Sequence, residues 1–158
     1  MKAASVKEIK TALTDLRKEE LVAMCLRLSK FKKENKELIT FVLFEEHDED
    51  SYTQNLMANI EEDFNCINTT NLYFTKKNIR RIIRSVNKYI RYSGKATIET
   101  ALLIHVCLQM RKKVIDLEKS QVLKNIFNAL LKRIDKSIAT MHEDLQFEYR
   151  RAKETILI

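Results

Sequence analysis

The feature that most constrains the fold of this 158-residue chain is its near lack of backbone breakers. It contains one glycine, Gly94, and no proline. Tight hairpin turns and phosphate-binding loops need positive φ angles at several positions, which glycine adopts without steric cost. The composition therefore excludes the P-loop, the dinucleotide fingerprint and the nucleophile elbow. Short polar links between helices need few such residues, so we predict an all-α fold.

Eight helices are expected from apolar residues that recur at three- and four-residue spacing. Capping patterns mark several ends: the capping boxes Ser5/Glu8, Ser51/Gln54 and Thr140/Glu143, side-chain caps at Asn35, Thr75 and Thr97, and Gly94 as a C-terminal cap. The expected ranges are about 5–15, 17–31, 35–46, 51–65, 75–93, 97–114, 120–139 and 140–156. Whether the last two form one kinked helix or two is open. Residues 66–74 are expected to form a loop that folds back on the core.

Short connections make consecutive helices antiparallel. We therefore expect one domain over 1–158, built from antiparallel helical hairpins as a compact bundle or an irregular HEAT- or armadillo-like superhelix. No apolar stretch is long enough to span a membrane and no secretory signal follows Met1, so we expect a cytoplasmic protein. An exposed apolar edge at Phe41, Phe44 or the terminal residues 156–158 would favour a homodimer.

The net charge of +7 comes from one segment. Residues 76–96 hold eight basic residues and no acidic one, whereas the rest of the chain has 21 basic and 22 acidic residues. On a helical wheel, seven of these cations share one arc opposite an isoleucine-rich face, and one tyrosine leans toward the same arc. We call these residues the basic face: Lys77, Arg80, Arg81, Arg84, Lys88, Arg91, Lys95 and Tyr92. Arginine suits bidentate contact with phosphate or carboxylate.

Several interpretations of the basic face are open. It is either a solvated surface partly neutralised by the acidic runs 45–50 and 61–63, or a site for nucleic-acid phosphates, an acidic protein or an acidic membrane surface. We predict a non-enzymatic helical interaction module that presents residues 76–95 to an acidic partner. Sequence-independent nucleic-acid binding through the same residues is the alternative, with tyrosines able to stack on unpaired bases. Both predictions depend on cations that face water without a neighbouring anion.

Motifs for catalysis, metals and cofactors are missing from the sequence, so we predict no enzyme, no metal site and no cofactor. His47 lies in the acidic run 45–50, which lacks EF-hand spacing. The three cysteines are widely spaced and include no CxxC pair, which argues against a zinc site or a disulfide framework. His105 and Cys107 point to different faces of one helix, which excludes a Cys–His nucleophile pair within it.

Residues 13–37 resemble the opening of a bacterial helical family of unknown function. The segment shows a short helix, a second helix that begins with KEEL at 18–21, and a third with E-x-K-E at 34–37. Because that family has no assigned activity, the resemblance implies a helical opening and no functional residue. The same region is similar to the SAP helix–extension–helix DNA-binding module, without the glycine-containing link of that module.

Overall fold

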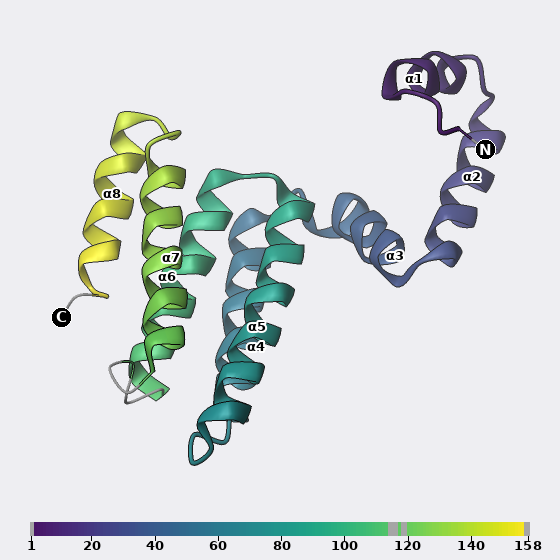
Figure 1. The fold of residues 1–158 in the computed structure, drawn as a ribbon. Coiled ribbons are helices and arrows are strands. Elements are labelled where there is room, and N and C mark those ends of the chain that lie inside the picture. The colour runs from purple at the N-terminus through teal and green to yellow at the C-terminus, as the bar shows by residue number, and fades with distance from the viewer. Residues whose placement is uncertain (1, 114–116, 118–119, 157–158) are drawn as a thin grey trace. The chain divides into compact units, whose positions relative to one another are not determined.

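The computed structural model describes residues 2–113, 117 and 120–156. Over this part of the chain the fold is all-helical, as the sequence predicts, with eight α-helices, a short π-helical turn and no strand (Figure 1). The elements are α1 (Val6–Thr14), α2 (Lys18–Phe31), α3 (Lys33–Thr40), the π-helical turn η1 (Phe41–Glu45), α4 (Glu49–Asn65), α5 (Leu72–Ser93), α6 (Ala96–Lys113), α7 (Gln121–Ile138) and α8 (Glu143–Glu154).

The chain divides into two compact units, residues 1–45 and 46–158, where the sequence predicts a single domain. The division follows the distribution of the core. No residue of α1, α2 or α3 is buried, whereas each helix from α4 to α7 contributes several buried side chains. Apolar periodicity shows that a helix is amphipathic but not whether another helix covers its apolar face. The two halves therefore look alike in sequence and differ in packing.

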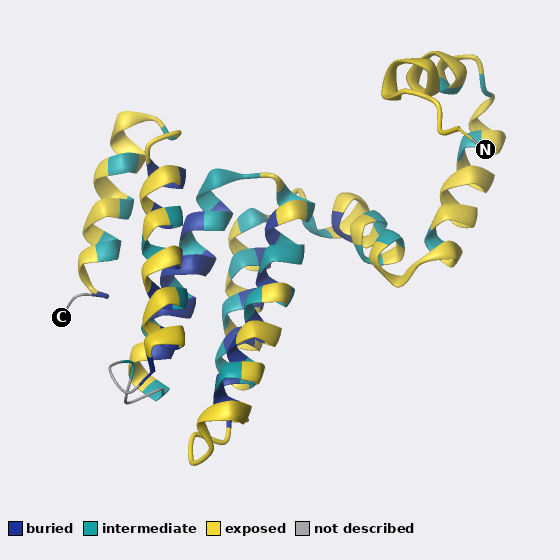
Figure 2. Cartoon of the chain, in the orientation of Figure 1, coloured by how far each residue is buried: buried dark blue, intermediate teal, exposed yellow. Residues whose placement is uncertain are grey.

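The second unit is a bundle built around α6, which contacts α4, α5, α7 and α8. Its residues Leu102, Leu103, Val106 and Met110 have no exposed surface. A helix buried on most of its circumference needs apolar residues on most faces, and 101–108 is the most apolar stretch of the chain. Figure 2 shows the buried residues along the facing sides of α4 to α7.

Exposed apolar side chains gather in the first unit. Val6 is 84% exposed, Phe31 76% and Phe44 65%, and Figure 2 shows α1 and α2 with no buried residue. The three apolar edges proposed for a dimer therefore differ: Phe44 is exposed, whereas Phe41 and Ile156 are buried. Residues 157 and 158 lie outside the described residues.

The start of α5 differs from the sequence prediction. Asn71 caps the helix, because its Oδ1 accepts a hydrogen bond from the Tyr73 amide at 2.9 Å. The helix therefore begins at Leu72 and not at Thr75, and 72–74 is an exposed first turn instead of a loop folded on the core. Thr75 is buried, and its hydroxyl donates to the carbonyl oxygens of Asn68 and Asn71.

Two of the predicted caps are confirmed. The Ser5 hydroxyl accepts from the Glu8 amide at 3.3 Å, and Glu8 accepts in return from the Ser5 amide at 2.7 Å, which completes the capping box. Gly94 ends α5 with a φ of 63°, a left-handed conformation that glycine adopts without strain. The single glycine therefore lies where the sequence predicts, between α5 and α6.

Other predicted boundaries are wrong. The Asp48 carboxylate accepts from the Ser51 amide at 3.0 Å, so α4 begins at Glu49 and Ser51 is already inside it. The Thr140 capping box does not form, since α8 begins at Glu143 after His142. Four residues separate α7 from α8, so the chain from 120 to 156 forms two helices. The helix predicted from 35 to 46 begins at Lys33 and passes into η1 after Thr40.

Candidate functional site

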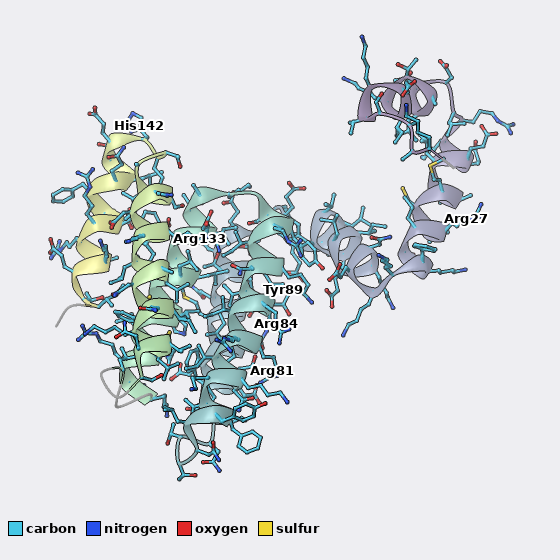
Figure 3. The ribbon with its side chains drawn as sticks, in the orientation of Figure 1. Arg27, Arg81, Arg84, Tyr89, Arg133 and His142 are labelled. Atoms are coloured by element: carbon cyan, nitrogen blue, oxygen red, sulfur yellow. The ribbon has the colours of Figure 1, made fainter. Side chains whose placement is uncertain are left out.

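The helix α5 holds most of the basic face on the side opposite the core. Ile79, Ile82, Val86 and Ile90 recur at three- and four-residue spacing and are buried. Because a helix turns about 100° per residue, this spacing places the arginines and lysines of α5 on the outer side. Lys95 follows Gly94 and lies outside α5, which ends at Ser93, so the helical wheel that grouped it with the other cations does not apply to it. Figure 3 labels Arg81 and Arg84 along α5.

Acidic residues of α4 neutralise part of the basic face. The Arg81 Nη2 donates to Asp63 Oδ1 at 2.9 Å, and the Lys95 Nζ donates to Glu49 Oε1 at 2.5 Å. Each of the two acidic runs singled out in the sequence therefore supplies one partner. The condition that all seven cations face water without an anion fails at these two positions.

Among the described residues, four cations on the other edge of α5 have no acidic partner. We call Lys76, Lys77, Arg80 and Arg84 the groove cations. Within the described residues, no carboxylate lies at ion-pair distance from any of them. The Arg84 Nε donates to the backbone carbonyl of Arg80 at 3.3 Å, which holds its guanidinium against the helix. Lys77, Arg80 and Arg84 are exposed, and Lys76 is half-buried.

The groove cations border a hollow of about 730 Å³ between α5 and α7, which we call the α5–α7 groove. Both helices pack against α6, and they run in the same direction (Figure 1). Besides the four cations, the groove is lined by Tyr73 and Ile83 from α5 and by Val122, Ile126, Ala129 and Leu130 from α7. An apolar wall on α7 therefore faces a basic wall on α5.

The wall on α7 supplies no acid to the groove. Asp135 is the only acidic residue of this helix, and its Oδ1 accepts from Lys153 Nζ on α8 at 2.5 Å. Arg133 of this helix is held by Glu99 of α6 and Asn87 of α5, to which its guanidinium donates. Figure 3 labels Arg133 on α7. Within the described residues, neither wall of the groove therefore supplies an acid that balances the charge of the groove cations.

The remaining members of the basic face do not line the groove. The Lys88 ammonium lies 5.1 Å from the centroid of the Tyr89 ring, and Tyr89 packs edge-to-face on Tyr92 with centroids 6.3 Å apart. These contacts are cation–π and aromatic interactions of the kind that stabilise a helix surface. Arg91 is exposed and lies beyond the lined length of the groove.

Three of the ten residues that line the groove belong to the basic face predicted from the sequence: Lys77, Arg80 and Arg84. Lys76 is a basic residue outside the predicted face, and Tyr73 lies in the first turn of α5 where the sequence predicts a loop. The apolar residues of α7 were missed because their spacing is that of any helix that faces a core. Val122 and Ala129 are in fact exposed, which no pattern in a single sequence reports.

The other side chains considered for catalysis or metal binding are His105, Cys107 and the acids of the run 45–50. Burial lowers the pKa of His105, and the neighbouring carboxylate of Glu61 only partly offsets this effect. Burial raises the pKa of Cys107 to about 12, so its thiol is not a nucleophile near neutral pH. Asp48 and Glu49 serve as helix cap and ion-pair partner, and the described residues include no cluster of three side chains able to hold a metal ion.

Comparison of the chain with known protein families, with curated proteins and with solved structures finds no match. The resemblance of residues 13–37 to a bacterial helical family therefore stays a prediction. Among the helices that the structure describes, none combines the length and the apolar character needed to cross a membrane.

Proposed function

We propose that this protein is a cytoplasmic, non-enzymatic helical interaction module that presents residues 76–95 to an acidic partner and binds it at the groove cations. The observation that carries the proposal is the lack of any acidic partner for Lys76, Lys77, Arg80 and Arg84 among the described residues. The three free cysteines fit a reducing compartment.

Like charges are held close together on α5. Lys76, Arg80 and Arg84 follow one another at i,i+4 spacing on one helix, and each such pair of like charges is unfavourable by a few tenths of a kcal/mol. Their helix is fixed by a buried core face, so the charges cannot separate by a change of the backbone. A partner carrying carboxylates removes this repulsion and adds charge-assisted hydrogen bonds to the arginines.

The apolar wall of the groove strengthens each of these contacts. Exposed ion pairs contribute little because water screens them. A partner seated between α5 and α7 would displace water from beside Ile83 and Ile126, and attraction between charges grows as the local dielectric falls. The positive field also raises the rate at which acidic partners arrive, and added salt lowers that rate.

The test is binding of a fluorescently labelled poly-glutamate peptide, followed by anisotropy at low and high salt. We expect salt-sensitive binding that Arg80/Arg84→Glu abolishes. The matched control is Arg150/Arg151→Glu on α8, which makes the same change in net charge at exposed positions away from the groove. If both double variants weaken binding equally, the attraction is general and the basic face is not the site. No binding at low salt would also contradict the proposal.

Nucleic acid is the second candidate partner, and Tyr73 is the observation that favours it. Its side chain is 66% exposed and lines the same groove as the four cations. An exposed aromatic ring beside cations is the arrangement on which unpaired bases stack. Labelled duplex DNA and single-stranded RNA should then bind with a steep salt dependence. Tyr73→Ala should lower the affinity for the single strand more than the affinity for the duplex. Equal losses of affinity would exclude stacking on Tyr73.

A further inference from the structure

We infer that the α5–α7 groove receives an acidic amphipathic α-helix from a partner protein, with its apolar stripe on α7 and its carboxylates against the groove cations. This inference rests on the proposed function and specifies the form of the acidic partner. It is drawn from three features of the groove: its length, the hydrogen-bonding state of its walls and the spacing of its charges.

The length of the groove matches a few turns of helix. Its lining on α5 extends from Tyr73 to Arg84, which at 1.5 Å per residue is about 16 Å, or three turns. The lining on α7 begins at Val122 and ends at Leu130, about 12 Å. Since both walls are helices packed on α6, a further helix would meet the ridges and grooves that helices present to one another.

The walls favour a helical ligand over an extended one. An extended peptide leaves its backbone N–H and C=O groups to be satisfied by its site, as happens at the edge of a sheet. The backbone groups of α5 and α7 are already used within each helix, so they offer no such edge. A helical ligand satisfies its own backbone and can bury an apolar stripe on Ile83, Val122 and Ile126.

The spacing of the groove cations sets the pattern of acids in the ligand. Lys76, Arg80 and Arg84 stand four residues apart, which is about 6 Å along the helix axis. Glutamates at i, i+4 and i+8 of a ligand helix have the same spacing, so each carboxylate meets one cation. The acids then lie along one edge of the ligand, beside an apolar stripe of leucines at i+3, i+6, i+7 and i+10.

The same features argue against the other occupants. A nucleic-acid backbone brings phosphates for the cations but no apolar stripe for Val122 and Ile126. In the acidic runs 45–50 and 61–63 of this chain, three acids are already engaged, since Asp48 caps α4 and Glu49 and Asp63 pair with Lys95 and Arg81. A partner with both an acidic edge and an apolar stripe is the one that uses both walls.

The experiment compares two synthetic peptides of identical leucine and glutamate content with the full-length protein. In one the residues follow the amphipathic pattern above, and in the other the order is scrambled so that neither period remains. Binding is measured by anisotropy, and the helix content of the peptide by circular dichroism. We expect the patterned peptide to bind at least tenfold more tightly and to gain helix on binding.

A pair of matched variants tests whether the groove is the place of binding. Ala129→Gln fills the exposed α7 wall with a neutral side chain that is a good helix former, and Ala58→Gln makes the same change at an exposed site on α4. Ala129→Gln should reduce the affinity for the patterned peptide at least tenfold and that for poly-glutamate by a much smaller factor. Ala58→Gln should change neither.

The outcomes separate this inference from the proposed function. Equal affinity for the patterned and scrambled peptides, with both lost in Arg80/Arg84→Glu, would overturn the helix inference and leave the acidic partner in place. Equal effects of Ala129→Gln and Ala58→Gln would also overturn it. A dimer in solution that Ala129→Gln dissociates would put a second copy of the chain in the groove instead. No binding of any acidic peptide at low salt would overturn both proposals.

Discussion

Arg81 donates to the carboxylate of Asp63 over 2.9 Å, whereas Arg84, three residues further along the same helix, donates to the carbonyl oxygen of Arg80. The two guanidinium groups differ because they lie on different edges of α5. One edge lies beside α4, whose acidic residues are within reach, and the other borders the groove formed with α7. The basic face is thus divided lengthwise by its neighbours, and within the described residues the edge along the groove keeps cations without an acidic partner.

Asp63→Asn should therefore increase the affinity for poly-glutamate by a few-fold, because it releases Arg81 from its partner. The cost in stability should stay below about 1 kcal/mol, since both side chains of the pair are more than a third exposed. Anisotropy and urea denaturation measure the two effects. Asp144→Asn, which removes the same charge at an exposed position on α8, is the control. An equal rise in both variants would show that only net charge matters.

Leu103→Ala should lower the free energy of unfolding by about 2–5 kcal/mol, because it leaves a cavity at the centre of the bundle. The Leu103 side chain has no exposed surface and lies on α6, which contacts four other helices. Leu26→Ala, the same change at an exposed position on α2, should stay within about 0.5 kcal/mol. Urea denaturation followed by circular dichroism compares the two. A similar loss of unfolding free energy in both variants would mean that Leu26 packs in a core of the first unit, contrary to its exposed fraction.

Most of what the sequence predicts correctly lies within single helices. The buried residues of α5, the capping box at Ser5 and the cap at Gly94 depend on spacings of a few residues, and local geometry decides them. The errors at Ser51 and Thr75 have a local cause as well. In both places a residue three or four positions earlier, Asp48 or Asn71, provides a better cap than the expected one.

The candidate site depends on which helices become neighbours, which a single sequence does not report. Arg81 and Arg84 are equivalent on a helical wheel of α5 alone, and they differ only once α4 and α7 are in place. Ile83 and Ile126 have the spacing of core residues, yet they line the groove because α6 separates their helices. The charge of the site was thus predictable, and its apolar wall was not.

The three cysteines should differ in reactivity with a thiol reagent. Cys107 is buried, and its raised pKa of about 12 leaves almost no thiolate at pH 8, whereas Cys25 and Cys66 are exposed. We expect two thiols to react in the native protein and three in guanidinium chloride, counted by mass spectrometry after alkylation. Peptide mapping should place the protected thiol at residue 107. Rapid native alkylation of Cys107 would contradict the packing of α6.

Removal of residues 1–45 should leave the rest of the chain folded, because nearly all of the buried residues lie in the second unit. A chain of residues 46–158 should keep a cooperative thermal transition and the helix content of α4 to α8. It should also bind less of a hydrophobic dye than the full chain, since most of the exposed large apolar side chains are in 6–44. Loss of the cooperative transition, or an unchanged dye signal, would contradict this division of the core.

His105 should make the protein less stable as the pH falls below about 6.5. Burial lowers the pKa of this side chain, so the folded protein keeps it neutral at pH values where the unfolded chain, with its ordinary pKa of 6.5, already binds a proton. The unfolded state therefore gains protons first, and the free energy of unfolding declines until the folded form titrates as well. Above the unfolded pKa both states are neutral and the contribution is constant.

Urea midpoints measured between about pH 7.5 and pH 5.5 test this dependence, a range that lies above the titration of ordinary carboxylates. Glu61 and Lys112, the charged groups that act on His105, oppose each other, and burial outweighs both. The decrease of the urea midpoint as the pH falls should be smaller in His105→Gln than in the wild-type protein. His142→Gln, at an exposed residue before α8, should retain it. If His105→Gln follows the wild-type curve, the pH dependence comes from another group and the desolvation of His105 has no effect on stability.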